Sequence, residues 1–97
     1  MGVRNTSRKA FHSLDDLGKR QRDVLNTIWK FPYGICNLDI SIYIEIPINQ
    51  ITPRTNELVN MGLVEESHRA RNVITGRQAI YWKLSLLGEK IINSLFI

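Results

Sequence analysis

One stretch, residues 45–64, constrains the fold more than any other part of the chain. Apolar or small residues recur in it at helical spacing, which predicts a helix with one narrow stripe facing a core; they are Ile48, Ile51, Thr55, Leu58 and Gly62. The opposite face is rich in amides and carries Asn49, Gln50, Pro53, Asn56, Glu57 and Asn60, with Thr52 and Arg54 on its flanks. Asn, Gln and Arg can pair with base edges in the DNA major groove. We therefore expect a DNA-reading helix over residues 47–61, with an ordinary solvated helix face as the alternative.

Proline and glycine mark the limits of this predicted helix. Pro47 suits a first-turn position, and Gly62 stands where a helix commonly ends in a left-handed residue. Pro53 lacks an N–H and would clash with the carbonyl group of Asn49, so we expect a slightly irregular or kinked first turn.

Composition bounds the kind of protein. The chain has 97 residues, 43% of them hydrophobic, and a formal net charge of +4, which predicts one domain with a small core and favours an anionic partner. Cys36 is the single cysteine, so we expect no disulfide framework, no cysteine-based metal site and a reducing, cytoplasmic location. No apolar run is long enough for a membrane span, and we expect no signal peptide. Residues 1–12 are predicted to form a basic flexible tail and residues 13–97 the folded domain.

A first helix is predicted over much of residues 13–31. Its apolar face would carry Leu14, Leu17, Val24, Leu25 and Ile28, with Gln21 as a polar exception. Two starts compete: a cap at Ser13 with Asp16 three residues later, or a start near Gly18. Pro32 ends the helix, and a very short strand is expected at residues 35–36.

Residues 37–46 give conflicting signals. Isoleucine at every second position from Ile40 to Ile48 is typical of a half-buried strand. Asn37, however, is a good N-cap, and Leu38, Ser41 and Ile44 can mark successive helical turns. We predict a helix, because a helix must precede the reading helix if the two are to dock as a helix-turn-helix.

After Gly62 the pattern changes to that of a hairpin. Residues 63–67 and 79–84 are predicted to be antiparallel strands, with Ile80 and Trp82 facing the core and Tyr81 and Lys83 facing outward. Residues 68–77 between them form a basic wing that contains Arg69, Arg71 and Arg77. Ser85 would cap a last helix, whose apolar residues Ile91, Ile92, Leu95 and Phe96 predict a homodimer contact. The predicted fold is an α+β winged helix-turn-helix, with a three-helix core, a two-stranded β wing and a C-terminal helix.

Several sequence blocks resemble one family. Residues 47–54 (Pro-Ile-Asn-Gln-Ile-Thr-Pro-Arg), Glu57-Leu58, residues 62–66 (Gly-Leu-Val-Glu-Glu) and residues 75–80 (Thr-Gly-Arg-Gln-Ala-Ile) resemble small MarR-like winged helix-turn-helix proteins found often in phage and prophage genomes. The similarity covers roughly residues 17–86. It implies a DNA-binding transcriptional regulator. The family usually has glycine at the position of Glu45 and alanine at that of Ser41.

The expected partner is double-stranded DNA. Helix 47–61 would enter the major groove, where Asn49 and Gln50 could pair with adenine, and Arg54 with guanine or phosphate. The wing would contact phosphate or the adjacent minor groove. Glu57 would repel phosphate unless Arg54 pairs with it. The candidate DNA-binding residues are Asn49, Gln50, Thr52, Pro53, Arg54, Asn56, Arg69, Arg71 and Arg77.

Other functions have less support in the sequence. His12, His68 and Cys36 lack metal-ligand spacing, and the Ser, His and acidic residues form no catalytic motif, so we expect no enzyme activity, no metal and no cofactor. The alternative function is a protein-interaction module in a replication, recombination or transcription complex. Ile42, Tyr43 and Tyr81, if exposed, would favour it.

Overall fold

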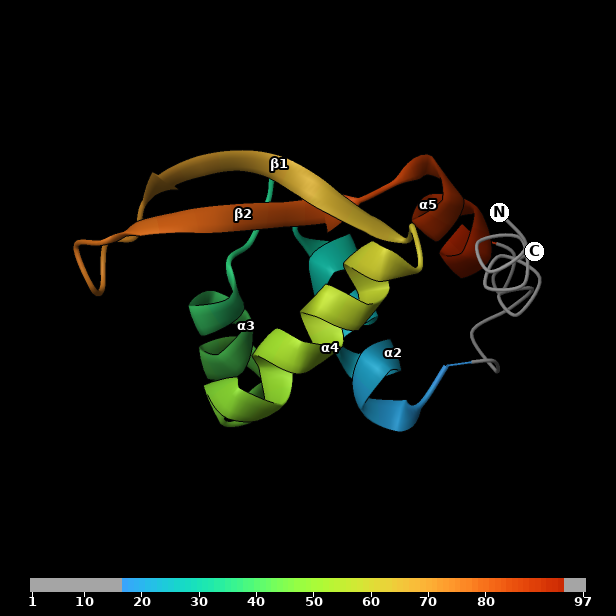
Figure 1. The fold of residues 1–97 in the computed structure, drawn as a ribbon, viewed down its shortest axis with the longest axis horizontal. Helices are drawn as coiled ribbons and strands as arrows, with labels where there is room; N and C mark the ends of the chain where they lie inside the picture. The colour runs from blue at the N-terminus through green and yellow to red at the C-terminus, as the bar shows by residue number, and fades with distance from the viewer. Residues whose placement is uncertain (1–16, 94–97) are drawn as a thin grey trace.

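The arrangement of helices around one hairpin follows the predicted order. The structure is a computed structural model and describes residues 17–93. Its elements are α2 (Lys19–Lys30), α3 (Asn37–Ile44), α4 (Ile48–Asn60), β1 (Val64–Arg71), β2 (Gln78–Leu84) and α5 (Leu86–Asn93). The two strands form an antiparallel hairpin that lies across α2, α3 and α4, with α5 at the end away from the hairpin turn (Figure 1). The α+β prediction is confirmed for these residues.

The core lies between α2, α4 and the base of the hairpin. From α2 it takes Val24, Leu25 and Ile28, and from α4 it takes Ile51, Thr55 and Leu58, all of them fully buried. Helix α2 begins at Lys19 after the N-cap Gly18, so the later of the two predicted starts is correct. The competing cap at Ser13 and Asp16 lies outside the described residues. Leu63, Val64, Leu84, Ile91 and Ile92 close the core from the hairpin and α5.

Helix α3 resolves the conflict over residues 37–46. Ile40 is buried and Ile44 packs against the core, whereas Ile42 is 53% exposed. Residues four apart share a helix face, but a half-buried strand would place all three on one face. The helix prediction is therefore correct. The cap was predicted one residue too late, because Cys36, not Asn37, is the N-cap.

The turn between α3 and α4 uses two unusual residues. Glu45 is the C-cap of α3 and adopts left-handed backbone angles, with φ 59° and ψ 45°. A side chain in this region costs about 1 kcal/mol or more, which explains why glycine is usual there. The hydroxyl of Ser41 donates to the carbonyl of Ile46 at 2.6 Å and helps to hold the turn.

Helix α4 agrees with the predicted range 47–61 to within one residue at each end. Pro47 is the N-cap and not a first-turn residue. Gly62 has a φ of 81°, and the N–H groups of Gly62 and Leu63 donate to the carbonyls of Val59 and Leu58, which is a Schellman motif. Ile48 was predicted to face the core but is 44% exposed at the first position of α4. The kink at Pro53 stays a prediction.

The hairpin is longer than predicted and less regular. Both strands continue past the predicted ends, so residues 68–71 belong to β1 and the connecting turn is only residues 72–77. A bulge between Glu66 and His68 breaks the alternation of faces in β1. The base of the hairpin is extended by Ile35, whose N–H and C=O pair with the backbone of Trp82 at 3.1 and 2.9 Å. This bridge corresponds to the short strand expected at residues 35–36.

The prediction of which β2 side chains face the core and which face solvent is only partly correct. Trp82 packs against the core but is not fully buried, and Ile80 is half-buried without joining the core cluster. Tyr81, predicted to face outward, is also half-buried, because its ring stacks on His68 with centroids 4.9 Å apart. Lys83 lies near Glu65 at 3.7 Å and keeps 43% of its side chain exposed.

Helix α5 hides more of its apolar surface than expected. Ser85 caps it, accepting a hydrogen bond from the Gly88 N–H at 3.0 Å. A Cβ atom at Gly88 would overlap the carbonyl of Leu63, so this close approach requires glycine. Ile91 and Ile92 are buried within the single chain, which removes two of the four residues assigned to a dimer contact. Leu95 and Phe96 lie outside the described residues.

Candidate nucleic-acid interface

The amide face of α4 is open to solvent. Asn49, Gln50, Pro53 and Asn56 are all exposed, as the helical periodicity predicts. Thr52 is half-buried, and its hydroxyl lies 3.5 Å from the Nδ2 atom of Asn37 at the start of α3. The helix therefore presents neutral donors and acceptors to solvent over its first half, with Thr52 at the edge nearest α3.

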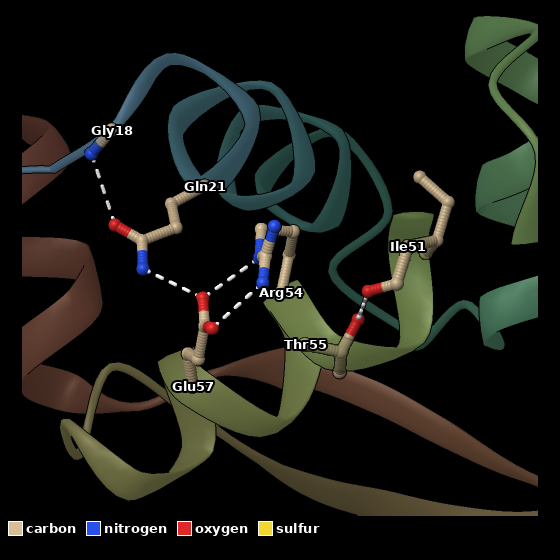
Figure 2. A network of polar contacts seen from close by, with 6 residues as sticks. All are labelled: Gly18, Gln21, Ile51, Arg54, Thr55 and Glu57. Carbon is tan, nitrogen blue, oxygen red and sulfur yellow. Dashed lines mark hydrogen bonds and ion pairs between the residues drawn. The ribbon is translucent and has the colours of Figure 1, made fainter. Parts of the chain in front are cut away.

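Arg54, unlike the exposed amides of α4, is engaged in an ion pair with Glu57 of the same helix. Its guanidinium donates twice to Glu57, from Nε to Oε1 and from Nη2 to Oε2, both at 2.8 Å. Gln21 donates to the same carboxylate at 2.8 Å, and its own Oε1 accepts the Gly18 N–H at 2.9 Å (Figure 2). These bonds link the start of α2 to the middle of α4. Gln21, the polar exception on the α2 face, thus has a structural partner that its own sequence context did not reveal.

This cluster changes the charge that α4 can offer. The hydrogen bonds from Arg54 and then from Gln21 hold the pKa of the Glu57 carboxyl below its ordinary value. Arg54 and Glu57 therefore form an ion pair with no net charge. This pairing is the condition under which Glu57 was expected not to repel phosphate. The same pairing holds the Arg54 guanidinium on Glu57 and leaves the exposed face of α4 without a free cation.

The wing arginines differ in their partners. Arg69 pairs with Glu66 at 3.1 Å, with 58% and 42% of the two side chains exposed. Arg71 donates from Nη1 to the Gly76 carbonyl at 3.2 Å, which braces the turn and leaves its charge unpaired by that contact. Arg77 is exposed, and its hydrogen bonds within residues 17–93 use its backbone N–H and C=O. Among the three, Arg77 is thus the one whose side chain forms no hydrogen bond or ion pair within residues 17–93.

A groove joins the wing to α4. It has a volume of about 540 Å³ and lies between the start of α3, one side of α4 and strand β2. Thr52 and Asn56 line it from α4, Arg77 lines it from the wing, and Ile48, Ile80 and Trp82 supply apolar surface. Of the predicted DNA-binding residues, the structure therefore brings Thr52, Asn56 and Arg77 together. Asn49, Gln50 and Pro53 lie outside the groove, and Arg54 is paired with Glu57 of its own helix.

Asn72 is a residue that the sequence analysis did not single out. It is 2% exposed although it stands in the wing turn, and its side chain bonds to α3, to β2 and within the turn itself. A signal was present, because asparagine is common at turns that use its side chain as an acceptor. Nothing in the sequence indicated that the same side chain reaches α3.

Two other structural features are absent from residues 17–93. No helix within residues 17–93 is long and apolar enough to cross a membrane. The same residues contain no group of three or more His, Cys, Asp or Glu side chains placed to hold a metal ion.

Comparison with known proteins identifies the fold. No family model and no curated protein matches the sequence. Among solved structures, a crystal structure of MarR has a TM-score of 0.66 and 21% identity, covering 98% of this chain and 69% of that chain. Wild-type MarR from E. coli in its apo form gives 0.65 and 22%, covering 96% and 67%. FabT of Streptococcus pneumoniae, solved in complex with DNA, gives 0.65 and 19%, covering 98% and 66%.

These matches span nearly all of this chain and about two-thirds of the longer proteins. The resemblance to MarR-like proteins drawn from the sequence is supported at the level of the fold, whereas the phage or prophage type stays a prediction. The chain has the winged-helix fold of the MarR structures.

Proposed function

We propose that this protein binds double-stranded DNA with a sequence preference and acts as a transcriptional regulator. The observation that carries the proposal is the groove, because it brings Thr52 and Asn56, at the edge of the exposed amide-rich face of α4, together with the exposed wing residue Arg77. Amides on a helix can read base edges in the major groove, and a cation at a fixed distance from that helix can contact the backbone. The DNA-bound state of FabT, a structure with the same fold, adds support.

The proposed roles are divided between the two elements. Asn49, Gln50 and Asn56 read bases, while Thr52 and Pro53 contact the backbone or base methyl groups beside them. Arg71 and Arg77 contact phosphate or the adjacent minor groove, and Arg69 adds a weaker contribution because Glu66 partly neutralises it. Arg54 serves mainly to orient α4 on α2. A phage or prophage setting is proposed on the sequence resemblance alone.

We also propose a homodimer, which now rests on other apolar residues than Ile91 and Ile92. The exposed apolar residues of α5 are Leu86 and Leu87, at 78% and 36% exposure, and Trp29 on α2 is 40% exposed. Leu86 and Trp29 line the same hollow. A symmetric dimer would place two copies of α4 about one turn of DNA apart. Sedimentation at tens of micromolar, roughly the concentration range in which weak interfaces form, tests for this dimer. A monomer at that concentration would contradict the proposal.

A second candidate function is docking on another protein. Tyr43 and Ile42 on α3 are 51% and 53% exposed, and they line a hollow with Ile74 of the wing turn. Large exposed apolar side chains grouped in this way are commoner at interaction surfaces than on a free surface. This hollow lies next to the wing and would be compatible with a role in a larger complex.

One experiment separates the two functions. A duplex obtained by binding-site selection and a scrambled duplex of the same composition are titrated with the protein at several salt concentrations. The regulator function predicts tighter than about micromolar binding of the selected duplex at low salt, weaker binding of the scrambled one, and a steep salt dependence. Binding of neither duplex at this level would contradict the proposal and favour docking.

A further inference from the structure

The wing turn, residues 72–77, is hydrogen-bonded to α3 through the buried side chain of Asn72. Asn72 is 2% exposed, although the next residue, Val73, is 96% exposed. Burying a polar side chain is unfavourable unless its donors and acceptors are satisfied. Asn72 meets this requirement with partners on three elements.

The amide nitrogen of Asn72 points away from the turn. Its Nδ2 atom lies 3.3 Å from the Cys36 Sγ atom, 3.2 Å from the Asp39 Oδ1 atom and 3.5 Å from the Tyr81 Oη atom. Cys36 is the N-cap of α3 and Asp39 lies in its first turn. The donor end of the side chain therefore connects the wing with the helix that packs against α4.

The other polar groups of Asn72 organise the turn itself. Its Oδ1 atom accepts the N–H groups of Ile74 and Thr75 at 2.9 and 3.2 Å. Its backbone N–H donates to the Arg77 carbonyl at 2.8 Å, and its carbonyl accepts the Gly76 N–H at 2.7 Å. Arg77 is thus bonded directly to the residue that is fixed on α3.

We propose that Asn72 is a positioning residue that sets the place of the wing arginines relative to α4 before DNA binds. The inference rests on the proposed DNA-binding function and deepens it. If the wing were free, ordering it on DNA would cost conformational entropy and reduce the gain from each phosphate contact. A wing already fixed to α3 avoids that cost, so Arg71 and Arg77 deliver more of their interaction with the backbone.

The two ends of the Asn72 side chain allow a selective test. Asn72→Asp keeps an oxygen for the Ile74 and Thr75 N–H groups but replaces the nitrogen that faces Asp39 with a second oxygen. The turn is retained while the tether to α3 is lost and replaced by like-charge repulsion. Val73→Asp is the matched control, because it adds the same charge at the adjacent, exposed position without touching the tether.

The readout is the contribution of Arg77, measured in each background. DNA affinity and its salt dependence are determined for the wild type, Asn72→Asp and Val73→Asp, each with and without Arg77→Ala. In the wild type and in Val73→Asp, Arg77→Ala should reduce the slope of log K against log salt by about one. In Asn72→Asp it should leave the slope nearly unchanged, and the affinity of Asn72→Asp itself should fall about tenfold further than that of Val73→Asp, a factor that equals about 1.4 kcal/mol.

A reciprocal exchange gives a rescue. Combining Asn72→Asp with Asp39→Asn restores one donor and one acceptor across the same contact at unchanged net charge, so the effect of Arg77→Ala on the slope should return. If Asn72→Asp does not fold by thermal melting, Asp39→Ala replaces it in the cycle, since this variant removes the acceptor on α3 and leaves the wing sequence intact.

The outcomes separate this inference from the proposed function. If the wild type binds DNA and Arg77→Ala has the same effect in every background, Asn72 is only structural and the inference is wrong. An equal loss of affinity in Asn72→Asp and Val73→Asp would also overturn it. If the wild type binds neither duplex, the proposed function itself fails.

Discussion

Helix α4 and the β1–β2 hairpin were predicted from the same kind of pattern, yet the pattern held along most of the helix, Ile48 excepted, and for little of the hairpin. Ile51, Thr55 and Leu58 are completely buried, while Asn49, Gln50 and Asn56 on the opposite face are exposed. In the hairpin, strict alternation predicted an equally sharp division. Residues 79–83 are instead all half-buried.

The difference has a physical cause. One face of α4 packs on α2, α3 and the hairpin, and the opposite face meets solvent. The centres of the two faces are therefore buried and exposed respectively, and only flanking residues such as Thr52 and Arg54 are half-buried. The hairpin has contacts on both faces. One face covers α4 and the core through Trp82, and on the other face Tyr81 stacks on His68 and bonds to Asn72. Periodicity predicts burial well where a single face is covered, and poorly where both faces are partly covered.

The largest expected effect tests the sharp division in α4. Leu58→Ala should lower the free energy of unfolding by about 2–5 kcal/mol, because it leaves a cavity in a fully buried position. Asn56→Ala on the exposed face of the same helix should change it by no more than about 0.5 kcal/mol. Urea unfolding of both variants measures the contrast. Similar losses in the two variants would show that α4 is not divided in this way.

A smaller effect tests the hairpin. Tyr81 and Lys83 share one face of β2 by alternation, but Tyr81 stacks on His68 at 4.9 Å while Lys83 makes only a long contact of 3.7 Å to Glu65. Tyr81→Ala should therefore destabilise by about 2 kcal/mol, through lost stacking and buried area. Lys83→Ala should be nearly neutral, because exposed ion pairs contribute little. If thermal melts show equal effects of the two substitutions, Tyr81 faces outward in the same way as Lys83, as simple alternation predicts.

The smallest effect concerns the Arg54–Glu57 pair at the edge of α4. The pKa of Glu57 is lowered in the folded protein, so its carboxylate contributes stability above the unfolded pKa and this contribution is lost as pH falls through the folded pKa. The contribution should be below about 1 kcal/mol, since 39% of the Glu57 side chain is exposed and water screens the pair.

Glu57→Gln isolates this contribution. Its stability relative to the wild type should be lower at neutral pH and should approach the wild-type value at acidic pH, as measured by urea unfolding at both pH values. Glu65→Gln serves as the control, because Glu65 faces Lys83 at 3.7 Å only. A Glu57→Gln variant with the same deficit at both pH values would show that the ion pair is not the cause.

Local sequence patterns predicted much of the fold. The helix over α4, its end at Gly62 and the preceding helix α3 follow from periodicity, glycine chemistry and docking requirements. The sequence left two starts of α2 open, one of which is correct. The exposure of Ile48 and the length of the hairpin did not follow, because both depend on contacts with other elements.

The candidate site was predicted less completely. Its exposed amides could be read from one helix face. The sequence indicated the Arg54–Glu57 pair only as the condition under which Glu57 would not repel phosphate. The participation of Gln21 could not be predicted, because it depends on a contact between residues 36 positions apart. The role of Asn72 also depends on a long-range contact, 33 positions away at Asp39. Single-sequence patterns carry no direct information on such contacts.

The most direct test of DNA reading by α4 compares Gln50→Ala with Arg77→Ala on the selected and scrambled duplexes. Gln50→Ala should cost about 1–3 kcal/mol on the selected duplex and little on the scrambled one, because base contacts provide discrimination. Arg77→Ala should weaken both by similar amounts and reduce the salt slope by about one. Fluorescence titration at several salt concentrations gives both quantities. If Gln50→Ala weakens the two duplexes equally, or neither, α4 does not read bases through this residue and the central claim is contradicted.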